Sequence, residues 1–190
     1  MILLASKSPR RRELLAALNI PFRIVNVCAE EGYPADLKEG DIPLFIARQK
    51  ADAYREPLTE GEVLLTADTI VWLDGTVLGK PKDEEEAAEM LHRLSGKTHQ
   101  VYTGVFLRTA KKECSFVSRS DVTFRELTEE EIHHYITNYH PLDKAGAYGI
   151  QEWIGYTGCV RIEGSFYNVM GLPTAALYDE LKKLKQMESD

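Results

Sequence analysis

The feature that most constrains the fold is the run Val63–Leu73, the most strand-like stretch of the chain. Asp74-Gly75 follows it as a strong signal for a two-residue hairpin turn, and Thr76–Leu78 forms the expected returning strand. Asp68 interrupts the apolar strand among apolar neighbours, which makes a water-exposed face the weaker interpretation. A buried carboxylate is costly unless it meets a cation, a metal or several hydrogen-bond donors. We therefore expect Asp68 to face a site.

The start of the chain predicts a strand, a turn and a helix that begins with three arginines. The apolar run Ile2–Ala5 is typical of a short buried strand, Ser8 offers an N-cap hydroxyl, and Pro9 suits the first helical position. Arg10–Arg12 then fall where the helix macrodipole favours acidic residues. Free amide groups and arginine side chains together could hold a phosphate chain, and local rules are often broken at functional sites. A solvated basic turn is an equally open alternative.

Two lysines stand where a phosphate site could use them. Lys50 lies four residues after Ile46, on the inward stripe of a helix predicted over residues 42–54. It either extends past the edge of the core or points into a site, and we favour the site. Gly79 and Pro81 should break the pairing of the hairpin and let Lys80 turn out of the sheet. The stretch from residue 75 to 80 is one residue too short for a Walker A loop, which we reject.

The rest of the chain alternates further strands and helices without a repeat or a linker. Strands are predicted over residues 99–109 and 115–124, and capped helices begin after Asp83 and Thr128. His133 and His134 are adjacent and lack metal-ligand spacing, so we interpret them as surface residues. A closing helix follows residue 173. We therefore predict a single domain over residues 1–190.

A glycine-rich segment, Asp143–Gln151, carries donors and acceptors between residues that permit tight turns. A plain connection is the alternative, but this mixture suits contact with a ligand better. The Gln151 amide presents a donor and an acceptor side by side, which complements the imide edge of uracil or thymine.

Composition limits the partners and the compartment. The formal net charge of -7 gives no general attraction to nucleic acid or to an anionic membrane surface. No apolar stretch approaches the length that spans a membrane, and no signal segment is apparent at the amino terminus. The 3 cysteines are widely spaced and lack a CxxC pair, which suits a reducing cytoplasm. We therefore expect neither a nucleic-acid partner nor a membrane partner.

Five strings in this order resemble the Maf family of nucleoside triphosphate pyrophosphatases: Ser6–Leu15, Ala67–Thr69, Gly79–Pro81, Asp143–Gln151 and Asn168–Pro173. The ending Gly149–Gln151 is similar to the branch that prefers dTTP and UTP. The resemblance implies an α/β fold related to the inosine triphosphate pyrophosphatases, with an elongated twisted mixed sheet, flanking helices and a central cleft. It also implies a divalent metal cation (Mg or Mn), a cytoplasmic location and a homodimer.

The activity implied by the resemblance is hydrolysis of dTTP and UTP, or of modified pyrimidine nucleotides, to the monophosphate and pyrophosphate. This chemistry needs neutralised phosphates and an oriented water molecule. Five side chains are expected to hold the phosphates or to offset their charge: Ser8, Arg10, Arg11, Lys50 and Lys80.

The remaining roles fall to two carboxylates and two polar side chains. Asp68 would activate or position the water with the help of the metal, and Glu31 is the second candidate carboxylate for the metal or the substrate. Thr69 and Gln151 would recognise the base. An alternative from another class is a nucleotide-sensing regulator of septum formation in which hydrolysis is secondary.

Overall fold

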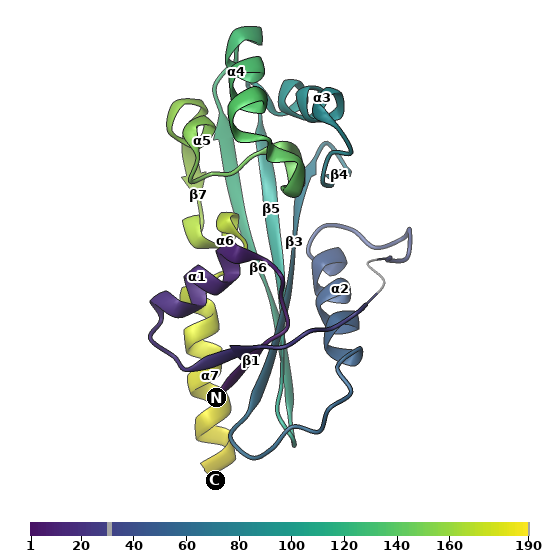
Figure 1. The fold of residues 1–190 in the computed structure, drawn as a ribbon, viewed down its shortest axis with the longest axis vertical. Helices are drawn as coiled ribbons and strands as arrows, with labels where there is room; N and C mark the ends of the chain where they lie inside the picture. Colours follow the sequence, from purple (N-terminus) through teal and green to yellow (C-terminus); the bar gives the residue numbers. More distant parts are fainter. Residues whose placement is uncertain (30–31, 190) are drawn as a thin grey trace. The chain divides into compact units, whose positions relative to one another are not determined.

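The computed structural model of the protein describes residues 1–29 and 32–189. Its strands are β1 (Ile2–Leu4), β2 (Phe22–Ile24), β3 (Val63–Leu73), β4 (Thr76–Leu78), β5 (Thr98–Arg108), β6 (Glu113–Phe124) and β7 (Cys159–Glu163). Its helices are α1 (Pro9–Ala17), α2 (Asp41–Asp52), α3 (Glu84–Leu94), α4 (Glu129–Tyr139), α5 (Trp153–Gly158), α6 (Phe166–Met170) and α7 (Thr174–Ser189) (Figure 1). Two short 3₁₀ turns, η1 (Pro141–Asp143) and η2 (Ala145–Ala147), precede α5.

The strands form one 7-stranded sheet in the order β2-β1-β3-β5-β6-β7, with β4 paired to β3. Strands β1 and β3 are parallel, whereas β3 and β4, and also β6 and β7, are antiparallel. The predicted α/β class with a mixed sheet and flanking helices is therefore confirmed.

The chain divides into two compact units. Unit 1 comprises Met1–Asp68, Thr103–Ser118 and Gly171–Asp190, and unit 2 comprises Thr69–Tyr102 and Arg119–Met170. Strands β3, β5 and β6 each contribute residues to both units. The single domain over residues 1–190 stays a prediction.

Unit 1 is organised around β1, which pairs in parallel with β2 and with β3. Leu3 lies opposite Leu64 and is fully buried in a core that also contains Ala47 of α2 and Phe106 of β5. Helix α2 approaches β5 so closely at Gly104 that a Cβ atom there would lie 2.3 Å from the backbone nitrogen of Leu44. Within this unit, α2 and α7 lie on opposite sides of the strands (Figure 1). The burial of β1 confirms its prediction from the apolar run.

Unit 2 contains the predicted hairpin and two capped helices. The hairpin register runs from Leu73 opposite Thr76 to Val71 opposite Leu78, where the pairing ends as expected before Gly79. Asp83 accepts a hydrogen bond from the Glu86 backbone at 2.8 Å and caps α3. Thr128 and Glu131 form a reciprocal capping box at the start of α4. These termini therefore follow from local side-chain chemistry, as the sequence predicted.

Three elements, α5, β7 and α6, were not predicted. Strand β7 pairs with β6, and all of its side chains are exposed or half-buried, so it lacks the buried apolar face by which a strand is recognised in a sequence. Strand β2 is short, and Arg23 and Ile24 on it are exposed. Across the part of the chain that the structure describes, none of the helices combines the length and the apolar character needed to cross a membrane.

Candidate active site

The turn between β1 and α1 leaves the sheet beside the middle of β3. Leu4 pairs with Leu65, and the Ala5 amide donates to the Leu65 carbonyl at 2.9 Å. Chain residues 6–8 then turn into α1, while β3 continues through Thr66 to Asp68. Within unit 1, the arginine-rich helix start and Asp68 therefore lie at the same end of the β1–β3 pair.

The backbone of the first turn of α1 is largely occupied, contrary to the expectation of free amides. Ser8 is the N-cap, and its Oγ accepts a hydrogen bond from the Arg11 amide at 3.4 Å. The Arg12 amide donates to the Ser8 carbonyl at 3.3 Å, and Pro9 has no amide hydrogen. The expectation was wrong because the cap and the proline that start this helix also remove its donors. Side chains must therefore supply most of the affinity for an anion at this turn.

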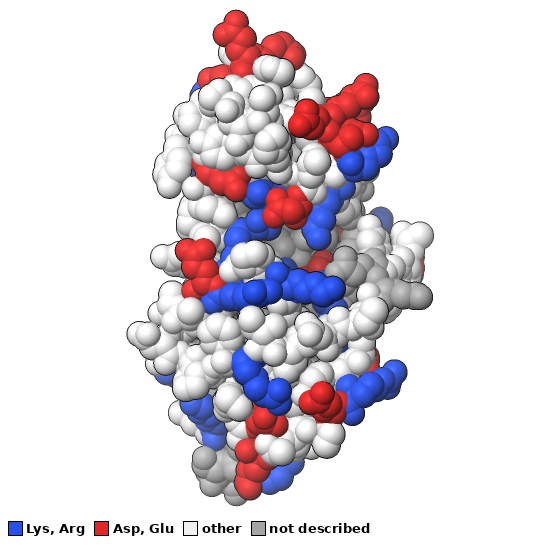
Figure 2. Space-filling model, viewed as in Figure 1, with Lys and Arg blue, Asp and Glu red and all other residues white. Residues whose placement is uncertain are grey.

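The Arg11 guanidinium reaches back across unit 1. Its Nε donates to the Gly171 carbonyl at 2.8 Å, and its Nη1 lies 3.5 Å from Ser6 Oγ. Arg10 is half-buried on the same turn. Blue Lys and Arg atoms form a stripe at the level of α1 on the face drawn in Figure 2. The Gly171 carbonyl was not identified from the sequence, because nothing local indicates a contact over 160 positions.

Lys50 and Asp68 form an ion pair. Lys50 Nζ lies 2.7 Å from Asp68 Oδ1, and the two side chains are 13% and 17% exposed. The hydroxyl of Thr66 donates to the Ala47 carbonyl at 2.6 Å, which ties α2 to β3 next to the pair. Lys50 thus points inward, and of the partners expected for a buried Asp68 a cation is present. Because both side chains are mostly buried, the attraction between their charges is stronger than at the surface, yet both still contact solvent.

Three predicted residues lie in unit 2: Thr69 on β3, Lys80 after the hairpin, and Gln151. The Gly146 amide donates to the Gly79 carbonyl at 3.0 Å, which joins the segment 143–151 to the turn that carries Lys80. A Cβ atom on Gly146 would lie 3.0 Å from a Val71 methyl group, so the same segment packs on β3 two residues beyond Thr69. Lys80 is exposed, as expected after the pairing ends.

The Gln151 side chain has a buried oxygen without a hydrogen bond from the described residues. Its Oε1 is buried and accepts no hydrogen bond from the residues that the structure describes. Leaving a buried acceptor unpaired costs on the order of 1–3 kcal/mol. A ligand that donates a hydrogen bond at this position would recover that cost.

Glu31, the second predicted carboxylate, lies outside the described residues. Within residues 1–29 and 32–189, the structure contains no group of three or more His, Cys, Asp or Glu side chains arranged to hold a metal ion. Asp68 is therefore the predicted metal ligand whose position is known.

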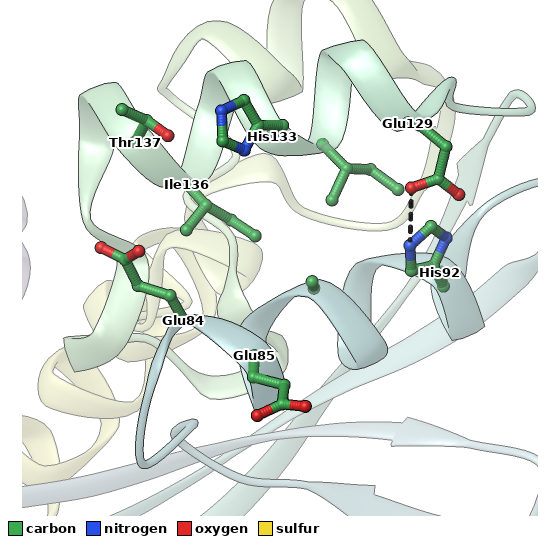
Figure 3. A pocket seen from close by; sticks show the side chains of 9 residues that line it. Glu84, Glu85, His92, Glu129, His133, Ile136 and Thr137 are labelled. Atoms are coloured by element: carbon green, nitrogen blue, oxygen red, sulfur yellow. Dashed lines mark ion pairs between the residues drawn. The ribbon is translucent and has the colours of Figure 1, made fainter.

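A hollow of about 280 Å³ between α3 and α4 does not coincide with the predicted site. Glu84, Glu85 and Glu129 line it, and His92 Nε2 lies 3.3 Å from a Glu129 oxygen (Figure 3). Its carboxylates would repel a triphosphate. It contains none of the residues selected from the sequence.

The predicted residues thus fall into two sets. Unit 1 carries the described residues expected to handle phosphates and water: Ser8, Arg10, Arg11, Lys50 and Asp68. Unit 2 carries one further lysine and the two expected base contacts: Lys80, Thr69 and Gln151. The chain passes from the first set to the second at the peptide bond between Asp68 and Thr69.

Sequence reasoning missed the side chains that support Gln151. Tyr135 lies on the buried face of α4, and the sequence does not indicate a role for its hydroxyl. Its partner Glu152 follows Gln151 directly, and Lys144 is buried beside it. The one available signal was the cluster of polar residues in 143–152, which does not reveal partners on another helix.

Comparison with known proteins agrees with the motifs. The family described as Maf-like protein matches residues 1–184. A dTTP/UTP pyrophosphatase of Bacteroides thetaiotaomicron is 58% identical over 96% of this chain and 95% of its own length. Proteins of the same name from Phocaeicola vulgatus and Porphyromonas gingivalis are 56% and 54% identical, over 96% and 95% of this chain and 95% and 92% of their own lengths. On this evidence, the chain belongs to the Maf family.

Proposed function

We propose that this protein hydrolyses dTTP and UTP between the α and β phosphates and releases the nucleoside monophosphate and pyrophosphate. The names of its curated relatives support this activity, since those proteins match over nearly their whole length. The observation in the structure that carries the proposal is the Lys50–Asp68 pair beside the arginine-rich start of α1. We place the reaction in the cytoplasm, and the free cysteines Cys28, Cys114 and Cys159 are compatible with that compartment.

The residues of unit 1 would bind the phosphates and orient the attacking water. The Arg10 and Arg11 side chains present guanidinium groups suited to phosphate oxygens, and Ser8 can contribute its hydroxyl. Lys50 pairs with the Asp68 carboxylate, which can orient the attacking water and accept its proton, and the lysine adds positive charge to a site that attracts polyphosphate. Lys80 of unit 2 would offset further negative charge on the phosphates. Electrostatic stabilisation of this kind is often the largest contribution to such catalysis.

The residues of unit 2 would recognise the base. The buried Gln151 oxygen would accept the imide N–H of uracil or thymine, and the amide nitrogen would donate to a neighbouring carbonyl. Thr69 would add a second polar contact. Cytosine has an acceptor at N3 and a donor at its 4-amino group, so an amide oriented for uracil or thymine would face it with mismatched hydrogen-bonding groups.

A divalent cation, Mg²⁺ or Mn²⁺, would bind together with the nucleotide. The described residues offer Asp68 as a carboxylate ligand and no larger cluster of metal ligands. One carboxylate with several phosphate oxygens is a common way to hold Mg²⁺. When bound, the ion would supply charge neutralisation on the phosphate chain.

The decisive experiment is the replacement Asp68→Asn. We expect release of pyrophosphate from dTTP to fall by at least about 10³-fold, because the carboxylate that accepts the proton is lost. Binding of dTTP should persist, since the arginines remain. Pyrophosphate release and equilibrium binding are measured on the same preparation.

Asp74→Asn is the matched control, because it makes the same change in the same hairpin at an exposed turn. Its side chain pairs with Lys97 on the surface, and turnover should stay within about twofold. Full activity of the Asp68 variant, or an equal loss in both variants, would refute the proposed role of Asp68.

A further inference from the structure

Gln151 is flanked by a buried network of three polar side chains in unit 2. Lys144 Nζ lies 2.7 Å from Asp143 Oδ1 and 3.1 Å from Glu152 Oε1. The Tyr135 hydroxyl donates to the other oxygen of Glu152. Lys144 is 7% exposed and Tyr135 is fully buried, so both contacts lie mostly away from water. Buried contacts of this kind are stronger and more rigid than their surface counterparts.

The network fixes the backbone on both sides of Gln151. The Gly149 amide donates to the Tyr135 hydroxyl at 2.9 Å, and the Glu152 amide donates to the Gly149 carbonyl at 3.0 Å. Tyr135 therefore accepts from the residue two positions before Gln151 and donates to the residue directly after it. Because the helix α4 holds Tyr135 on its buried face, this short segment is attached to a rigid element.

The Tyr135 hydroxyl keeps its proton in this network. Burial, reinforced by the hydrogen bond to Glu152, raises the pKa of Tyr135 well above its ordinary value. The phenol thus keeps its proton at neutral pH and can donate to Glu152 while it accepts from Gly149. A single hydroxyl consequently links both ends of the turn that carries Gln151.

The Glu152 carboxylate occupies the space that a side chain at position 149 would need. A Cβ atom on residue 149 would lie 2.7 Å from Glu152 Cδ and within 3.0 Å of both carboxylate oxygens. The obstacle is the end of a side chain rather than backbone, so a methyl group would displace the carboxylate and leave the chain trace in place. Gly149 therefore offers a way to disturb the network without removing any of its members.

We propose that the Tyr135–Glu152–Lys144 network positions the Gln151 amide and thereby sets how strongly the protein prefers uracil and thymine over cytosine. This inference rests on the proposed function, in which Gln151 recognises the base. The three side chains are positioning residues, because they act on the nucleotide through the backbone and the amide of Gln151. An amide that is already held in place loses less conformational entropy when the base binds, so the network should affect the affinity for the base.

The test compares Tyr135→Phe and Gly149→Ala with the unmodified protein on dTTP, UTP and dCTP. We expect the ratio of kcat/KM for dTTP to that for dCTP to fall about tenfold in both variants, which corresponds to one hydrogen bond. The change should appear as a higher KM for dTTP with kcat within about threefold. Binding of inorganic tripolyphosphate, a probe without a base, should not change, because its expected contacts lie mainly in unit 1.

Matched controls separate positioning from general damage. Tyr139→Phe removes a hydroxyl from the ring that stacks on Tyr135 at 5.1 Å, and it should keep the full preference. Glu152→Gln retains the shape and an acceptor for Tyr135, so it should keep more of the preference than Glu152→Ala does.

The possible outcomes distinguish failure of this inference from failure of the proposed function. An unmodified protein without preference for dTTP and UTP over dCTP would refute the proposed function. A normal preference that survives in both Tyr135→Phe and Gly149→Ala would overturn the positioning role and leave the function intact. Equal losses on every nucleotide together with weaker tripolyphosphate binding would also overturn it, since they would indicate a structural defect.

Discussion

A single buried side chain of unit 2, His99, must be uncharged in the folded protein. His99 on β5 is fully buried, and its Nε2 lies 2.7 Å from the hydroxyl of Tyr148. The rings of His99, Tyr148 and Phe124 also pack edge to face at 5.0–5.3 Å. Burial lowers the pKa of His99 to about 4, although Asp121 acts in the opposite direction. The folded protein therefore requires a neutral imidazole at this position.

This requirement predicts a pH-dependent stability. The unfolded chain binds a proton at His99 near pH 6.5, whereas the folded chain binds it only near pH 4, so the free energy of unfolding falls as the pH drops through this window. Between pH 7 and pH 5 the loss from this residue should be about 2 kcal/mol. Urea unfolding at the two pH values measures it, and His99→Gln should remove that share of the change. An equal pH dependence in the variant would show that other groups are responsible.

Elements with local start and stop signals could be predicted, and elements stabilised by distant contacts could not. Ser8, Asp83 and Thr128 cap their helices through bonds within a few residues, and the hairpin after Leu73 follows from its turn. Strand β7 depends on pairing with β6, which no local pattern encodes. The same distinction holds for the site. Lys50 was identified from helical spacing, whereas the hydrogen bond from Tyr135 of α4 reaches Glu152, 17 positions later in the sequence.

The capping box of α4 gives a prediction for one element. Thr128→Ala removes the hydroxyl that accepts from the Glu131 amide at 3.2 Å, and it should cost about 1 kcal/mol. For a chain of this size the melting temperature should fall by roughly 2–4 °C. Thr128→Ser keeps the cap and should melt close to the unmodified protein. A variant Thr128→Ala that melts at the original temperature would show that the tertiary packing of α4 outweighs its cap.

The contact of α2 with β5 gives a second prediction at this scale. Gly104→Ala would force a methyl group against the backbone of α2, 2.3 Å from the Leu44 nitrogen, where no side chain can move away. We expect a loss of at least about 3 kcal/mol, at the upper end of the usual effects of overpacking. Because α2 carries Lys50, activity should fall as well. Gly32→Ala, with open space around residue 32, is the control, and thermal unfolding of both variants is the measurement.

On the scale of the whole molecule, the net charge is negative, whereas the residues proposed to bind phosphates are positive. The chain carries a net charge of -7, which on its own would repel a nucleoside triphosphate. Attraction must therefore come from local groups, and the predicted cations lie on α1, on α2 and after the hairpin. The acidic hollow between α3 and α4 is unsuited to phosphates, so the same chain offers contrasting electrostatic environments.

The division of roles between the two units leads to a final prediction for the entire chain. Pyrophosphate can engage the phosphate-binding residues but has no base, so in the Asp68→Asn variant it should protect amides around residues 8–12 of unit 1 from hydrogen exchange. The nucleotide dTTP should protect the same amides and also those of residues 147–152 in unit 2, because the base would complete the hydrogen bonds of Gln151. The nucleotide dCTP should protect the first segment and have less effect on the second, since cytosine has an acceptor at N3 where the Gln151 oxygen would expect a donor. Protection by dTTP that is confined to one segment would contradict the assignment of most phosphate contacts to unit 1 and of base recognition to unit 2.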